Sequence, residues 1–269
     1  MNALTKVLTV VLLVISIGMF VYLYSSVEKV IDDRKAIESK ENAVIERLKL
    51  IREAQIVFNE VNGRYTANWD SLSSFIQNGQ VPIIERKETI IQKAYGGEEV
   101  KVSFDTLGFV SAKERIFKKN FTLSAADNGT FAGYNVKVGD NVIRNMKAYR
   151  INVGGTEKQP PFPEEGVIDN LTDVAPGEEL KKGQILINYS RYQFNPNIDL
   201  SRIGFKPDSE EKFEIFVSKV DKSGLMVQVI EVRDPKPDNP SRKESNEQKA
   251  RKPLRFGSRT DVSTAGNWE

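Results

Sequence analysis

The segment from Val7 to Tyr24 (VLTVVLLVISIGMFVYLY) is 18 residues long and carries no charged side chain. As a helix it would measure about 27 Å, close to the roughly 30 Å of a bilayer's hydrocarbon core. Lys6 flanks it on the N-terminal side, and Phe20, Tyr22 and Tyr24 lie where aromatic side chains gather at a membrane surface. The sequence therefore predicts a transmembrane anchor at residues 7–24.

Two alternatives to an uncleaved anchor are a removable signal peptide and a buried helix of a soluble protein. A signal peptide has a shorter apolar region and small residues before its cleavage site. Here the apolar segment continues into Tyr-Leu-Tyr-Ser-Ser-Val, which is a poor cleavage site. The sequence favours the anchor over both alternatives.

The charges around this segment leave its orientation open. One positive side chain, Lys6, lies on the N-terminal side of the segment, and four follow it: Lys29, Arg34, Lys35 and Lys40. This count favours a body in the cytoplasm. Short N-terminal stubs such as residues 1–6, however, commonly stay in the cytoplasm. We expect a single-pass protein of the bacterial inner membrane with its body in the periplasm.

The missing residue types restrict the chemistry of the chain. With no histidine and no cysteine, a Ser-His-Asp triad, a thiol nucleophile and a thiolate zinc site are all excluded. Carboxylate chemistry, Ser-Lys chemistry and hard-metal binding by acids remain, but no phosphate-binding, dinucleotide-binding or calcium-binding motif is present. The net charge of +2 indicates no nucleic-acid partner. We therefore expect no catalytic residues, no cofactor and no metal.

A helical pattern continues beyond the anchor, through residues 25–61. Its seam follows alternating steps of three and four residues and includes Val30, Ile37, Val44, Leu48 and Ile51. Such a stalk would add about 55 Å beyond the bilayer. One interpretation is a coiled coil between copies of the chain, with these five residues at the contact. The other is an amphipathic helix whose second half packs against its own globular domain.

Residues 62–232 predict a head of class α+β, mixed and mainly antiparallel, with short helices. Asn62-Gly63 ends the stalk helix, Asn68 caps a helix over Trp69–Asn78, and Ser111–Glu114 forms a capping box. Residues 120–175 are rich in turns and indicate a β-rich elaboration.

The strand signals of the head are of two kinds. Val100, Val102 and Phe104 alternate with polar residues, which predicts a strand with one buried face. The clearest hairpin pairs Phe213–Val220 with Leu225–Val232.

The C-terminal 37 residues, from 233 on, change in character. Residues 233–252 contain three prolines, an excess of basic side chains and few apolar ones, which predicts a disordered basic linker. Residues 253–269 regain Leu254, Phe256 and Trp268, which predicts a docking segment. Its target is either the chain's own surface or a partner, and the former is the favoured interpretation.

The phrase IREAQIVFNEVNGRYTANWDSLSSFI at residues 51–76 resembles the end of the long helix in type IV pilins and type II secretion pseudopilins. The matching residues are Arg52, Ala54, Gln55, Phe58, Asn62, Gly63, Arg64, Tyr65 and Leu72. The chain departs from that family in lacking a glycine at a leader cleavage site and an acid in the apolar helix.

Nearly the full chain is similar to single-pass envelope proteins of Bacteroidota. The resemblance rests on the same head phrase, on DTLGFVSAKERIF at residues 105–117, and on the GNWE end. It implies an envelope location without a known activity. We expect a membrane-anchored structural subunit of a secretion, motility or pilus-like apparatus, with other envelope proteins as partners. The coiled-coil interpretation of the stalk adds further copies of the chain. The alternative is a binding module for a glycan, peptide or anionic ligand.

Overall fold

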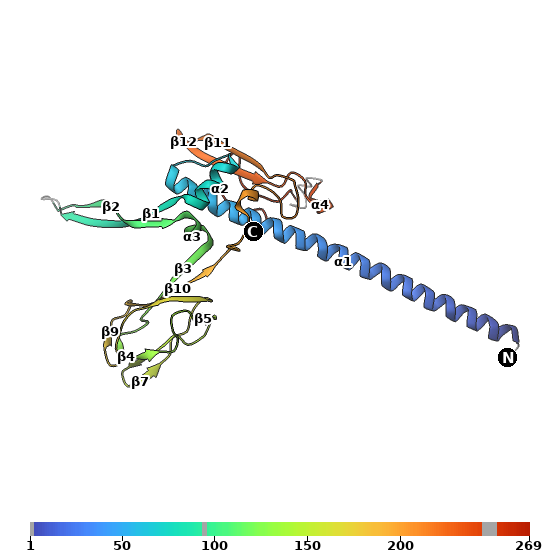
Figure 1. Cartoon of the computed structure of the whole chain (residues 1–269), viewed down its shortest axis with the longest axis horizontal. Coiled ribbons are helices and arrows are strands. Elements are labelled where there is room, and N and C mark those ends of the chain that lie inside the picture. The colour runs from blue at the N-terminus through green and yellow to red at the C-terminus, as the bar shows by residue number, and fades with distance from the viewer. Residues whose placement is uncertain (1–2, 93–95, 244–251) are drawn as a thin grey trace. The chain divides into compact units, whose positions relative to one another are not determined.

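A computed structural model describes residues 3–92, 96–243 and 252–269. Its first element is α1 (Ala3–Asn62), one continuous helix of 60 residues (Figure 1), which at 1.5 Å per residue is about 90 Å long. The helix ends where the sequence predicts, because Gly63 takes the left-handed φ of +66° and donates its N–H to the Asn59 carbonyl at 2.8 Å. A long N-terminal helix followed by antiparallel sheets and short helices confirms the α+β class.

The chain divides into two compact units, one of residues 1–52 with 202–269 and one of residues 53–201. The helix α1 contributes to both, and the predicted head, residues 62–232, is distributed between them.

In the second unit, capping residues mark where the two short helices begin. In α2 (Trp69–Asn78) the Asn68 side chain accepts the N–H groups of Asp70 and Ser71 at 2.8 and 3.0 Å. In α3 (Ala112–Phe117) the Ser111 hydroxyl accepts the Glu114 N–H at 3.1 Å. Both predicted caps are confirmed, since each satisfies amides that the first helical turn leaves free.

Gln55 explains one polar position of the pilin-like phrase. Its side chain is 1% exposed, donates to the Thr66 carbonyl at 2.7 Å and accepts the Thr66 N–H at 3.1 Å. This double contact fixes the loop after α1, and it makes a glutamine the natural occupant of a buried helical position.

Between α2 and α3 runs a long hairpin of β1 (Gln80–Gln92) and β2 (Glu98–Ser111), which pair only with each other among the described strands. The remaining strands of this unit form two four-stranded antiparallel sheets, in the orders β3-β10-β8-β5 and β7-β6-β4-β9. Their bounds are β3 (Lys118–Ser124), β4 (Gly129–Tyr134), β5 (Asn141–Val142), β6 (Tyr149–Val153), β7 (Thr156–Lys158), β8 (Gly166–Leu171), β9 (Glu179–Leu180) and β10 (Ile185–Tyr192).

The two four-stranded sheets share one apolar core. Phe131 and Ile151 of one sheet and Ile187 and Tyr189 of the other are each at most 2% exposed. The predicted elaboration at residues 120–175 therefore includes the later strands β9 and β10, which pair with β4, β3 and β8.

The first unit contains the sheet β11-β12-β13, formed by β11 (Glu214–Lys222), β12 (Leu225–Arg233) and β13 (Arg255–Gly257). The predicted hairpin is confirmed as β11–β12. At its turn the Asp221 carboxylate accepts the Gly224 N–H at 2.7 Å, and Ser223 and Gly224 both have positive φ. Two short helical segments remain, η1 (Leu200–Arg202) at the sequence boundary between the two units and α4 (Pro240–Lys243) between β12 and β13 in the sequence.

Residues 233–243 of the predicted linker lie within this unit. Asp234 is 1% exposed, and the Arg242 guanidinium and the Asn239 amide both contact the Glu41 carboxylate of α1. Residues 244–251, on which the rest of the disorder prediction falls, lie outside the described residues.

Candidate functional site

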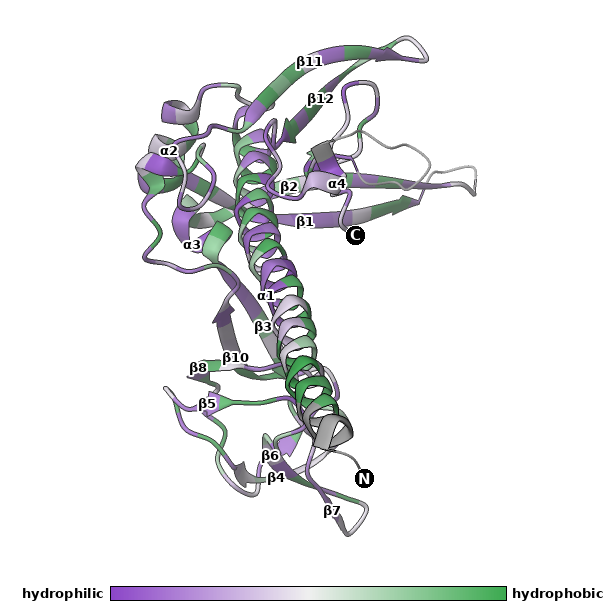
Figure 2. Cartoon of the chain, turned by 90° about the vertical axis from the view of Figure 1, so that its right-hand side faces the viewer, coloured by the Kyte–Doolittle hydropathy of each residue, from purple (hydrophilic) through white to green (hydrophobic). Residues whose placement is uncertain are grey.

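The apolar half of α1 is the first functional surface. Within the described residues, α1 is the one helix long and apolar enough to cross a membrane, and none of its most apolar stretch is buried in the protein. Leu12, Ile17 and Phe20 are 57%, 56% and 70% exposed. Figure 2 shows hydrophobic residues concentrated toward the N-terminal end of this helix. Moving a helix of this composition from water into lipid lowers its free energy.

The five predicted seam residues of the stalk fall into two groups. Val30 is 49% exposed and Ile37 is half-buried, whereas Val44, Leu48 and Ile51 are at most 3% exposed. In the same stretch of α1, Arg47 donates to the carbonyls of Arg202 and Phe205 at 2.7 and 3.3 Å. Val44, Leu48 and Ile51 therefore pack inside their own chain, which matches the second interpretation of the stalk, and they are not available to a second copy.

The C-terminal segment docks on its own unit. Leu254 and Phe256 are 2% and 0% exposed, and β13 extends the sheet by pairing with β12. Trp268 is half-buried beneath the Arg52 guanidinium, which lies 5.9 Å from its ring and also pairs with Glu269. The prediction of self-docking by this segment is confirmed for Leu254 and Phe256.

Sequence reasoning gave no sign of the buried ion cluster around Lys206. Its side chain is 3% exposed, and its ammonium lies 3.3 Å from Asp234, 3.2 Å from Asp238 and 3.6 Å from Glu211. Burial alone would lower the pKa of Lys206, but the carboxylates of Asp234 and Asp238 outweigh burial and raise that pKa above its usual 10.5. Lys206, Glu211 and Asp238 line a cleft of about 310 Å³ against α1.

Because the pKa of Lys206 is raised in the folded state, its charge stabilises the fold at every pH below 10.5 and the contribution is lost as pH rises above that value. We expect the difference in unfolding free energy between the wild type and Lys206→Ala to shrink above pH 10.5. Denaturant titrations of both proteins at neutral and alkaline pH measure it. A difference that stays constant would contradict this assignment.

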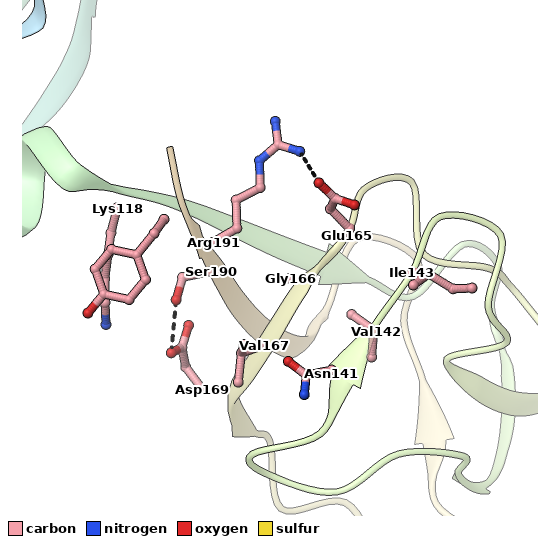
Figure 3. Close-up of a pocket in the computed structure, with 11 residues that line it drawn as sticks. Lys118, Asn141, Val142, Ile143, Glu165, Gly166, Val167, Asp169, Ser190 and Arg191 are labelled. Atoms are coloured by element: carbon pink, nitrogen blue, oxygen red, sulfur yellow. Dashed lines mark hydrogen bonds and ion pairs between the residues drawn. The ribbon is translucent and has the colours of Figure 1, made fainter. Parts of the chain in front are cut away.

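A shallow pocket of about 420 Å³ lies on the β3-β10-β8-β5 sheet. Figure 3 shows Ser190 and Asp169 joined by a hydrogen bond of 3.0 Å, and Arg191 joined to Glu165 at 3.2 Å. The carboxylates of Asp169 and Glu165 thus already have partners, and the Ser190 hydroxyl donates its hydrogen bond to Asp169 rather than to a lysine amine. The arrangement suits polar recognition better than Ser-Lys catalysis.

No group of three or more acids is placed to hold a metal ion in the described parts of the chain. Comparisons with protein-family models and with curated proteins find no match. The resemblances to pilins and to envelope proteins therefore stay predictions.

The hairpin β1–β2 is the surface whose burial was predicted wrongly from the sequence. The alternation of Val100, Val102 and Phe104 predicts a buried face, yet these residues are 54%, 37% and 70% exposed. On the paired strand Ile84 and Ile90 are 56% and 62% exposed. The alternation does separate an apolar face from a polar one, but no described element covers the apolar face. Figure 1 shows the two strands running side by side away from α2 and α3.

Proposed function

We propose that the protein is a membrane-anchored structural subunit of a cell-envelope assembly of the secretion, motility or pilus-like kind. It spans the bacterial inner membrane once, with its body in the periplasm. It acts through protein–protein contacts and has no catalytic activity of its own.

The single observation that carries this proposal is the uncovered apolar face of β1–β2. Five large apolar side chains of that face are between 37% and 70% exposed: Ile84, Ile90, Val100, Val102 and Phe104. A contiguous apolar surface on a soluble region costs free energy in water unless another molecule covers it. A two-stranded sheet alone is marginally stable, so a partner would also stabilise the hairpin.

The membrane location rests on a second, independent observation. The apolar part of α1 finds no cover within the described protein, and a bilayer supplies the apolar surroundings that it needs. Anchoring also restricts the protein to one surface, where copies and partners meet at high effective concentration.

A different candidate function is a binding module for a glycan, peptide or anionic ligand. It is favoured by the pocket of Figure 3, whose volume of about 420 Å³ lies in the range of small-ligand sites. Lys118 and Arg191 supply positive charge at its rim. Ligand-dependent thermal stabilisation of the full chain as a monomer would support this function over the structural one.

The orientation of the body can be tested with single cysteines, because the wild-type chain has none. We expect Val262→Cys, at a side chain that is 53% exposed, to react with a membrane-impermeant maleimide in intact spheroplasts. The control Asn2→Cys, in the predicted cytoplasmic stub, should react only after lysis. The opposite pattern would place the body in the cytoplasm.

The assembly itself is tested by the native mass of the tagged full chain after mild detergent extraction from its own membranes. Several copies, or a stable complex with other envelope proteins, would support the proposal. A lone monomer would contradict it.

A further inference from the structure

The pairing of β1 with β2 assigns every residue of the hairpin to one of two faces. Ile84 pairs with Thr106, Arg86 with Phe104, Glu88 with Val102, and Ile90 with Val100. Directly paired residues share a face, and side chains alternate along a strand. These eight residues therefore lie on one side of the hairpin and are here called the ribbon face. Gln92 and Glu98, which pair with each other, continue this side toward the end of the hairpin.

The opposite face of the hairpin has a polar centre, where the charged side chains form ion pairs with one another. Lys87 lies 3.1 Å from both Glu85 and Asp105, and all three side chains are about half-exposed. Ser103, Thr89 and Lys101 continue this side, and the pair of Ile91 with Glu99 lies at its end, with Ile91 45% exposed. Water rather than a protein partner is the natural neighbour of such a surface.

The ribbon face carries two charges, Arg86 and Glu88, which are paired with each other at 2.6 Å and lie between Ile84 and Ile90. Along β1 the face therefore has the order apolar, positive, negative, apolar. Reversing the strand direction exchanges the position of Arg86 with that of Glu88, and the position of Ile84 with that of Ile90. The face is thus complementary in charge to a copy of itself that runs antiparallel.

The same reversal suits β2. When the face is turned about its centre, Phe104 meets Val102 and Val100 meets Thr106, so that no charge is placed against an apolar side chain. Turning the second copy about an axis parallel to the strands would instead place Arg86 over Phe104 and Glu88 over Val102, which sets both charges against apolar side chains. The pattern selects one partner and one orientation.

We propose that the ribbon face binds the ribbon face of a second copy of this chain, antiparallel and about a two-fold axis. Two sheets stacked in this way lie about 10 Å apart, with the apolar side chains interdigitated. Arg86 of each copy pairs with Glu88 of the other, and Ile84 covers Ile90. The contact is isologous, as in most closed dimers. This proposal rests on the proposed structural function and names one partner of it.

The test uses two differently tagged full-length chains, produced together and extracted in mild detergent. The measured quantity is the fraction of the second tag that purifies with the first. The Arg86→Glu chain carries two carboxylates on the ribbon face, and the Glu88→Arg chain carries two guanidinium groups. We expect each variant paired with itself to lose at least about tenfold in co-purification, which corresponds to about 1.4 kcal/mol.

Mixing the two variants is the decisive step. Arg86→Glu paired with Glu88→Arg restores opposite charges at both positions, and co-purification should return to the wild-type level. This rescue also excludes misfolding as the cause of the losses, because each variant must be folded to take part. If co-purification is unchanged in the single variants, or is not restored in the mixture, the proposal is overturned.

A matched control separates face packing from pairing of strand edges. Lys101→Glu makes the same change of charge on the polar face and should leave co-purification unchanged. In an antiparallel edge contact between two β2 strands centred on Ser103, Lys101 would meet Asp105 of the other copy. A loss caused by Lys101→Glu but not by Arg86→Glu would therefore overturn the face contact in favour of an edge contact.

The outcomes for the ribbon face and for the proposed function are distinguishable. A native complex that holds one copy of this chain together with other envelope proteins would retain the function and refute the ribbon dimer. A lone monomer in native membranes would refute both.

Discussion

Replacing Leu13 and Ile17 with lysine should release the protein from membranes. Both side chains are 56% exposed on the apolar part of α1, and a lysine near the centre of a membrane span costs about 2.5–3.5 kcal/mol. Two of them are expected to cost about 5–7 kcal/mol, enough to abolish stable insertion. The measurement is the fraction of the chain that stays in the membrane pellet after alkaline extraction.

A matched control places the same two charges at the same spacing farther along the helix. Val27→Lys with Ile31→Lys changes side chains that are also exposed, at 58% and 46%, but that lie beyond the apolar segment. This variant should remain in the pellet. The anchor would be refuted by a wild-type protein that is extracted as readily as the double variant at Leu13 and Ile17.

Replacing Lys206 with alanine should cost about 3–5 kcal/mol of unfolding free energy. Most of this cost comes from the carboxylate of Asp234, which loses its charged partner while its side chain stays buried, at 2% exposed. Without the ammonium, that charge stays buried and uncompensated, or it takes up a proton at a cost. The change is measured by denaturant unfolding of the full chain, with a signal that reports on the first unit.

Two further variants define the origin of this loss. Adding Asp234→Asn to Lys206→Ala should recover part of the stability, because it removes the uncompensated charge. Lys236→Ala breaks an exposed ion pair with Glu211 and should change stability by less than about 1 kcal/mol. Equal losses for Lys206→Ala and Lys236→Ala would refute a structural role for the buried cluster.

Local signals of the sequence predicted local structure well. The caps at Asn68 and Ser111, the end of α1 at Gly63 and the turn at Asp221–Gly224 depend on hydrogen bonds within a few residues, all of which form. Such contacts can be inferred from residue types and spacing alone.

Burial by distant segments was predicted less well. The steps of three and four along α1 mark an apolar stripe at Val44, Leu48 and Ile51, but they do not tell whether the stripe meets its own chain or another. Alternation in β2 likewise separates two faces without saying what covers either. The prolines of residues 233–243 suggested disorder, whereas Asp234 is held at Lys206 by a cluster that residues 206–211 and 234–238 form together. In each case a tertiary contact decides the outcome.

We propose that the protein works as part of an assembly of anchored chains. The most direct measurement is the native mass of the full chain, extracted in mild detergent from its own membranes. We expect a mass above that of a single chain, from several copies or from a complex with other envelope proteins. A monodisperse single chain, at the concentration found in those membranes, would contradict the claim.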